Sequence, residues 1–260
     1  MDMEIYIFVA VTGFVAAFID AAAGGGGMIS LPALMLTGIS PLQALGTNKM
    51  AAVMGACTSF ITFVRSGKMD VQLIKKLFPL SLIGSVLGVL AVKQVPSEFL
   101  RPLIVVLLIV VVLYSILKKD WDKDTQPGKL TGKMLALSMA AALAMGFYDG
   151  FFGPGTGSLL LFIFCMLGFD FISATANTKA LNFASNLSAT IFFGLSGMIN
   201  FEMGIFMGIT MIFGAYCGAR FAITKGVTYV RPMFIVVTTL LIGKQLLSLM
   251  DGKISVDSTY

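Results

Sequence analysis

The sequence predicts an all-α integral membrane protein of two inverted repeats, with about eight long transmembrane helices and two short helices that follow glycine-rich breaks. Three observations lead to this prediction: the composition, the lengths of the apolar runs and an internal similarity. Of the 260 residues, 57% are hydrophobic and only 12% are charged, whereas soluble domains are roughly 25% charged. The mean hydropathy is +0.94. This amount of polar surface is too small to cover the core of a soluble protein of this size. We therefore expect lipid to surround most of the chain.

Apolar runs divide the chain into elements, since a helix needs about 20 apolar residues to cross a bilayer. The long runs cover residues 4–22, 41–64, 72–92, 99–117, 133–151, 171–195, 200–221 and 229–250. Two shorter runs, 28–38 and 157–168, each follow a glycine cluster and cannot cross alone. The first run carries Asp2 and Glu4 where a signal peptide would have basic residues, so we expect it to remain as a helix.

An internal similarity divides the chain into two halves. Residues 44–70 (ALGTNKMAAVMGACTSFITFVRSGKMD) align with 174–200 (ATANTKALNFASNLSATIFFGLSGMIN) at a constant offset of 130. Upstream, DAAAGGGG at 20–27 matches DGFFGPGTG at 149–157, with one residue inserted. We therefore predict a first repeat over residues 1–117, a charged linker over 118–132 and a second repeat over 133–260.

Basic residues indicate how the halves are oriented. If each half crosses the membrane an odd number of times, the second half is inverted relative to the first. The segment 118–133 with its five lysines and the basic loops 65–76 and 220–231 then share one side, while the loop 196–199 on the other side has no basic residue. Because basic loops stay in the cytoplasm, we expect a multi-pass protein of the cell inner membrane with a cytoplasmic linker and both termini outside.

Two lysines lie inside the predicted membrane helices. Ser40 is the expected N-cap of the helix 41–64 and Asp170 caps its counterpart. Lys49 follows its cap by nine residues, a depth of roughly 13 Å, and Lys179 is at the same depth. Burying a lysine this deeply costs on the order of 3 kcal/mol. The flanking polar residues are Thr47, Asn48, Asn177 and Thr178, and Asn182 and Asn186 continue the second polar stripe.

Two interpretations of these lysines are open. They can form structural ion pairs, Lys49 with Asp20 and Lys179 with Asp149, because buried charges usually survive in pairs. Alternatively, they form a cationic site for an anion, with the two acids acting as gates, as competitors or as carriers of a coupling proton.

The glycine clusters favour the anion site. Backbone N–H groups at the start of a helix attract anions, and irregular backbone at membrane depth is tolerated beside a cavity. The expected donors are Gly25, Gly26, Gly27, Gly155, Thr156 and Gly157. The alternative is close helix packing through small residues. Neither cluster is a nucleotide phosphate loop, because the Gly-Lys-Ser/Thr ending is absent.

Several other classes of function are excluded or disfavoured. The chain has no histidine, and its three scattered cysteines form neither a disulfide framework nor a metal site. The motif at 194–197, GLSG, is that of intramembrane serine proteases, but no histidine can activate the serine. We therefore expect no enzyme activity, no cofactor, no metal and no nucleic-acid partner, and any proton coupling must use a carboxylate.

The motifs DAAAGGGGMISLPAL (20–34), ALGTNKMA (44–51), GFFGPGTGS (150–158) and ATANTKALNFASNLSA (174–189) resemble the sulfite exporter TauE/SafE family of membrane permeases. The resemblance covers both halves. It implies an inner-membrane carrier for small sulfur-containing anions such as sulfite, sulfoacetate and other organosulfonates. Asp149 stands where the family pattern has glycine, and this extra acid could pair with Lys179, alter affinity or introduce proton coupling.

The residues and the resemblance together predict a secondary transporter that binds one small anion near the membrane midplane and works by alternating access. The resemblance implies that it is an exporter. An anion channel and a membrane subunit of a larger transport complex are the alternatives. The expected partners are a small anionic substrate, the lipid bilayer and a coupling proton or cation. A homo-oligomer is compatible with the sequence.

Overall fold

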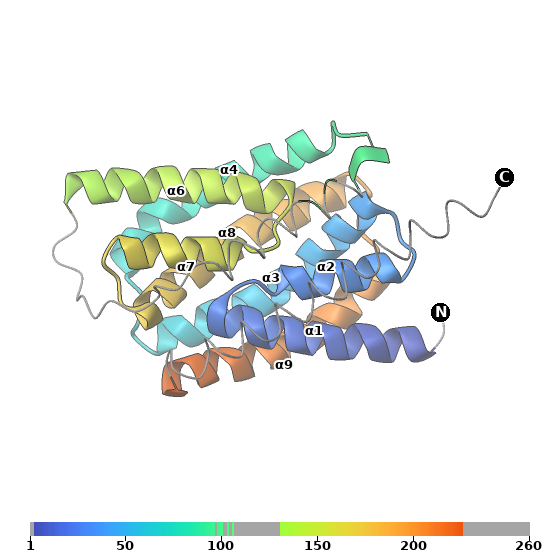
Figure 1. Cartoon of the computed structure of the whole chain (residues 1–260), viewed down its shortest axis with the longest axis horizontal. Helices are drawn as coiled ribbons and strands as arrows, with labels where there is room; N and C mark the ends of the chain where they lie inside the picture. The colour runs from blue at the N-terminus through green and yellow to red at the C-terminus, as the bar shows by residue number, and fades with distance from the viewer. Residues whose placement is uncertain (1–2, 97, 101–102, 104–105, 107–130, 226–260) are drawn as a thin grey trace.

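The computed structural model describes residues 3–96, 98–100, 103, 106 and 131–225 (Figure 1). The helices in these residues are α1 (Met3–Ala23), α2 (Gly27–Leu36), α3 (Pro41–Arg65), α4 (Val71–Val92), α6 (Gly132–Phe151), α7 (Thr156–Met166), α8 (Phe171–Leu195) and α9 (Phe201–Lys225). The described part contains no strand, so the all-α prediction is confirmed there. The predicted run 229–250, most of the run 99–117 and nearly all of the linker 118–132 lie outside the described residues.

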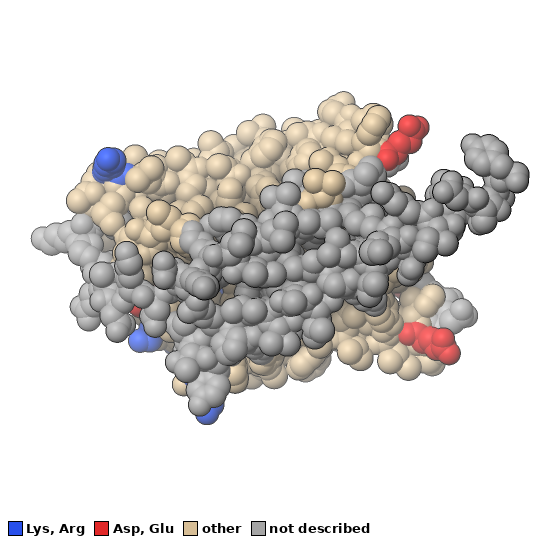
Figure 2. All heavy atoms as spheres, in the orientation of Figure 1, with Lys and Arg blue, Asp and Glu red and all other residues tan. Residues whose placement is uncertain are grey.

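Apolar surface dominates the outside of the described helices. By length and composition, α1, α4, α6 and α9 could each cross a membrane. Large apolar side chains on these helices are exposed, for example Ile7, Leu87, Leu143 and Phe213. In the space-filling view, the coloured charged residues appear near the two ends of the molecule and an uncharged tan region lies between them (Figure 2). This distribution is that of an integral membrane protein.

The two predicted N-caps are confirmed. Ser40 Oγ accepts a hydrogen bond from the Gln43 backbone N–H at 3.3 Å, and Pro41 occupies the first turn of α3. Asp170 Oδ1 accepts from the backbone N–H groups of Ile172 and Ser173, each at 3.1 Å. These bonds satisfy N–H groups that have no partner within the helix, and they define where each lysine-bearing helix begins.

Glycines set the close packing of the outer helix pairs. A Cβ atom at Gly218 of α9 would lie 2.1 Å from the carbonyl oxygen of Phe18 in α1, and one at Gly150 of α6 would lie 2.0 Å from that of Ser85 in α4. The backbones therefore touch in both pairs, as small residues allow between membrane helices. Because Gly214 and Gly218 meet Phe14 and Phe18 in the same order, α1 and α9 run in the same direction.

The other helices continue this pattern of directions. On α4, Gly84 approaches Leu143 of α6 and Gly88 approaches Phe147, so these two helices also run in the same direction. The two central helices, α3 and α8, run in opposite directions, since Gly46 near the start of α3 lies against Phe193 near the end of α8. Figure 1 shows the same arrangement, with α1 and α6 pointing opposite ways.

Matched hydrogen bonds tie each central helix to the other half of the chain. Thr47 Oγ1 on α3 accepts from the backbone N–H of Asn200 at 2.9 Å, directly before α9. Asn177 Oδ1 on α8 accepts from the backbone N–H of Asp70 at 3.0 Å, directly before α4. Residues 47 and 177, like 70 and 200, differ by the repeat offset of 130. The internal similarity therefore extends from sequence to tertiary contacts.

The two glycine breaks meet each other at the centre of the molecule. Gly24 and Gly25 have φ values of +81° and +92°, and Gly153 and Gly155 have +99° and +85°. A Cβ atom at Gly24 would lie 2.5 Å from the carbonyl carbon of Gly157. Both positive φ and close approach thus require glycine here. Close packing through small residues, one of the two interpretations of these clusters, is therefore present.

Candidate functional site

A cavity of about 50 Å³ lies between the two halves, beside the glycine breaks. Since one water needs roughly 10–15 Å³ on this scale, the cavity can hold a few water molecules or one small ion. Its polar lining comes from α1, α2, α3, α7, α8 and the end of α6: Asp20, Ser30, Asn48, Lys49, Ser59, Asp149, Thr156, Asn182 and Asn186. Most glycines of the two breaks, small residues of α1, α3 and α9, and Met211 complete it.

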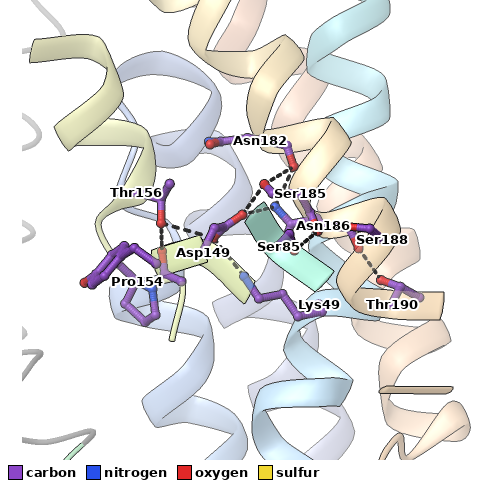
Figure 3. Close-up of polar contacts among 12 residues, drawn as sticks. Lys49, Ser85, Asp149, Pro154, Thr156, Asn182, Ser185, Asn186, Ser188 and Thr190 are labelled. Atoms are coloured by element: carbon purple, nitrogen blue, oxygen red, sulfur yellow. Dashed lines mark hydrogen bonds and ion pairs between the residues drawn. The ribbon is translucent and has the colours of Figure 1, made fainter. Parts of the chain in front are cut away.

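Lys49 forms an ion pair with Asp149 at the end of α6. The distance from Lys49 Nζ to Asp149 Oδ1 is 2.8 Å, and both side chains are almost completely buried. Thr156 also donates to Oδ1, at 3.1 Å, while Ser185 and Asn186 of α8 donate to Oδ2. Figure 3 shows these side chains converging on the carboxylate from three helices. Charge-assisted bonds of this kind offset much of the cost of burying the carboxylate.

Lys179 forms the second ion pair, with Asp20 near the end of α1. Lys179 Nζ donates to Asp20 Oδ2 at 2.9 Å, and the lysine side chain has no exposed surface. The Asp20 side chain keeps 28% of its surface exposed, and its Oδ1 accepts from the Gly26 backbone N–H at 3.2 Å. The four charges that the sequence singled out are therefore gathered between the halves.

The expected pairing of partners is wrong. The sequence predicted Lys49 with Asp20 and Lys179 with Asp149, within each half, but each lysine pairs with the acid of the other half. The helix directions explain this result. Long side chains lean toward the amino end of their helix, and because α6 runs opposite to α3, the carboxyl end of α6 with Asp149 lies on that side of Lys49. The same reasoning places Lys179 against Asp20.

The other predicted site residues fall into two groups. Asn48, Gly25, Gly26, Gly27, Gly155, Thr156 and Gly157 line the cavity. Thr47, Asn177 and Thr178 do not line it: the first two hold the starts of α9 and α4, and the Thr178 hydroxyl is buried without a hydrogen-bond partner. The oxygens Oδ1 of Asn48 and of Asn182 are also buried without a partner, and both residues border the cavity.

Three polar residues important to this geometry were not among the predicted site residues. Asn182, Ser185 and Asn186 lie at helical spacing on α8, and the last two bond Asp149 directly. The polar stripe at 179, 182 and 186 was a usable signal, because residue 185 shares that face of a helix. Ser30 and Ser59 line the cavity without any comparable signal in the sequence.

The site carries two positive and two negative groups, so its formal charges balance. Among the described residues, no group of three or more His, Cys, Asp or Glu could hold a metal ion. Lys49 lines the cavity and Lys179 does not, and both lysine charges are already paired with carboxylates.

Comparison with known proteins identifies related membrane proteins over most of the chain. The profile of the family described as Sulfite exporter TauE/SafE matches residues 9–244. A probable membrane transporter protein of a Sinorhizobium species is 38% identical over 92% of this chain and 91% of its own length. A probable membrane transporter protein of Haemophilus influenzae is 36% identical, covering 89% of this chain and 91% of that protein.

A further relative, the probable membrane transporter protein YfcA of Escherichia coli K12, is 35% identical over 89% of this chain and 86% of its own length. No solved structure matches the chain. The family match over residues 9–244 spans both halves of the chain.

Proposed function

Because the chain belongs to the sulfite exporter TauE/SafE family of membrane transporters, we propose that it is a secondary transporter that exports a small sulfur-containing anion, such as sulfite or an organosulfonate. The protein resides in the cell inner membrane, and the anion binds in the cavity between the halves, close to the midplane of that membrane. Transport proceeds by alternating access, without a cofactor and without enzymatic chemistry.

The main support for this proposal is that each of the two ion pairs joins a lysine of one half to an acid of the other half. Each pair joins the two halves, and each borders or directly adjoins the cavity. An oxyanion that replaces a carboxylate beside Lys49 or Lys179 still compensates the charge of that lysine. It also breaks the ion pair that joined the two halves at this point. Substrate binding is thereby linked to relative movement, since a ligand shifts a conformational equilibrium only by making different contacts in the two states.

Alternating access is supported by the helix directions. Corresponding helices α1 and α6 run opposite ways, as do α3 and α8, which is the relation expected of inverted repeats. On α3, the cavity lining begins at Asn48 and Lys49 and continues to Ser59, toward the end at Arg65. We propose that this end faces the cytoplasm with the linker 118–132, so the described conformation is the inward-facing one.

Flux of anions in proteoliposomes tests the function. We expect Lys49→Ala and Lys179→Ala each to reduce sulfite and methanesulfonate flux by at least about tenfold, because each change removes an ammonium group beside which the anion is proposed to bind. Lys76→Ala, which changes an exposed lysine of α4, should leave flux unchanged. If both central variants retained wild-type flux for every sulfur anion tested, this site would be wrong.

The same vesicles separate a carrier from the two alternatives. A carrier saturates and exchanges internal for external anion, whereas an anion channel passes large currents without exchange. A subunit of a larger complex would show no flux as the purified chain. We expect saturable exchange from the purified protein alone.

Thiol labelling tests alternating access with a matched pair of positions. Ser59 lines the cavity, whereas Ala189, its counterpart at the offset of 130, does not; both side chains are buried in the described conformation. In a background with Cys57, Cys165 and Cys217 changed to alanine, a membrane-impermeant reagent on the Arg65 side should label Ser59→Cys but not Ala189→Cys. We expect Ala189→Cys to become reactive from the opposite side during exchange; equal labelling of both cysteines from one side would contradict alternation.

A further inference from the structure

The two central ion pairs are unequal, although they occupy equivalent positions in the repeat. Asp149 has donors from four side chains, Lys49, Thr156, Ser185 and Asn186, and its side chain is 4% exposed. Asp20 has the Lys179 ammonium and one backbone N–H, from Gly26, and its side chain is 28% exposed. The charge of Asp149 is therefore held by protein donors, whereas that of Asp20 is accessible from the cavity.

Sequence differences between the repeats account for this inequality. The positions equivalent to Ser185 and Asn186 are Gly55 and Ala56, which have no polar side chain and border the cavity. The position equivalent to Thr156 is Gly26, where a Cβ atom would lie 2.4 Å from the Ala16 carbonyl oxygen. No hydroxyl can replace the missing donor there. Beside Asp20, the first half therefore has cavity space where the second half has hydrogen-bond donors beside Asp149.

Asp20 separates the cavity from Lys179. The carboxylate lines the cavity and binds Lys179 through Oδ2, while Lys179 itself is completely buried and does not line the cavity. An anion can reach Lys179 only after Asp20 moves away. A displaced Asp20 carboxylate would then be a second negative charge next to the anion, and uptake of one proton by this carboxylate removes the repulsion.

We propose that Asp20 is the proton carrier of the transporter and that Asp149 keeps its ion pair with Lys49 throughout the cycle. The inference rests on the proposed anion transport and adds its coupling ion. One proton from water binds the Asp20 carboxylate as the anion takes its place beside the Lys179 ammonium. The pair has zero net charge before this step, from one carboxylate and one ammonium, and zero afterwards, from one anion and one ammonium. One proton accompanies each monovalent anion, and the two gradients together set the direction of flow.

The charged groups around Asp20 are few. Lys179 from α8 is its direct partner, and Lys49 from α3 and Asp149 from α6 border the same cavity, paired with each other. The cavity-lining residues of α2, α7 and α9 carry no ionisable group. Proton exchange at Asp20 therefore changes one ion pair and leaves the other intact.

The Asp20→Asn variant tests this assignment. Asparagine resembles the protonated acid, so the anion-loaded form keeps its paired Lys179 and should still exchange internal for external methanesulfonate. The unloaded form would bury Lys179 without a partner, and its return across the membrane should be blocked. We expect net methanesulfonate efflux from proteoliposomes to fall at least about tenfold and its accompanying proton movement to disappear. Asp170→Asn, which preserves an N-cap, is the matched control and should behave as wild type.

Methanesulfonate is used because its charge does not change between pH 5 and pH 8, about the range of the assay. Net efflux that remains coupled to protons in Asp20→Asn would overturn the inference while anion transport stands. A wild-type protein that moves neither methanesulfonate nor sulfite would overturn the proposed function, and the coupling with it. These two failures are distinguished in the same vesicles.

A second variant tests the inference if Asp20→Asn does not fold. Ala56→Asn restores, in the first half, the amide that bonds Asp149 in the second. This donor should stabilise ionised Asp20 and lower the pH of half-maximal net efflux by about one unit. An unchanged pH profile in a folded Ala56→Asn protein would overturn the role of Asp20.

Discussion

Asp149→Asn is expected to destabilise the protein severely, and Lys49→Gln in the same chain is expected to restore much of the loss. Asp149 joins Lys49 of α3 to Ser185 and Asn186 of α8. Removing one member of a buried ion pair costs about 3–5 kcal/mol, because the remaining charge has no partner. The thermal midpoint of the purified protein in detergent measures the loss, and gel filtration measures the folded fraction.

The crossed geometry makes this rescue specific. Lys49→Gln should rescue Asp149→Asn, since the doubly neutral pair has no unpaired charge and its two amides can hydrogen-bond to each other. Lys49→Gln should not rescue Asp20→Asn, because that combination leaves Asp149 and Lys179 each without a partner. Rescue of Asp20→Asn but not of Asp149→Asn would show pairing within each half instead.

The rescued double variant also separates stability from transport. Its thermal midpoint should approach that of the wild type, but it lacks the ammonium group of Lys49, which lines the cavity that the anion enters. We expect flux to stay at least about tenfold below wild type, consistent with buried polar groups that are kept for function and not for stability.

Gly24→Ala is expected to have the second large effect, loss of most folded protein and of anion flux. The new methyl group would lie 2.5 Å from the backbone of Gly157, in the opposite glycine break. Neither side of this contact has a flexible side chain that could move away. The backbone of Gly24 also has a φ of +81°, a conformation that alanine adopts only at a cost of about 1–2 kcal/mol. Yield after gel filtration and proteoliposome flux measure the two losses.

Gly67→Ala is the matched control for this substitution. Gly67 has a similar φ of +69°, but a Cβ atom there has no neighbour within 4 Å. The control therefore carries the backbone strain without the collision between the breaks. We expect it to fold and to transport, with a modest reduction in thermal stability. Equal losses in both variants would mean that backbone strain, and not contact between the breaks, is what requires glycine at residue 24.

Much of the fold was predictable because the membrane imposes simple rules on the sequence. The long apolar run 72–92 became α4, and the N-caps Ser40 and Asp170 begin α3 and α8 as expected. Helix length and capping depend on local residues and on the thickness of the bilayer. The offset of 130 also relates Thr47 to Asn177, and the structure shows that these two residues make matched bonds.

The candidate site was predictable as a set of residues but not as a set of contacts. Duplication and intramembrane charge singled out Lys49, Lys179, Asp20 and Asp149. Thr47 and Asn177, chosen as neighbours of the lysines, instead hold the starts of other helices. Adjacent residues point in different directions on a helix, so proximity in sequence does not place side chains in one cavity.

By itself, the sequence determined that this chain is a membrane protein and that its two halves are similar. It also determined that the rare charges within the apolar runs form two equivalent lysine–acid sets. The tertiary structure alone decided that each ion pair joins the two halves and that, of the two acids bordering the cavity, Asp20 has the fewer hydrogen-bond donors. Burial and pairing depend on helix directions and on which residues of distant segments face one another. A repeat aligns equivalent residues, but packing at the centre decides which of them meet.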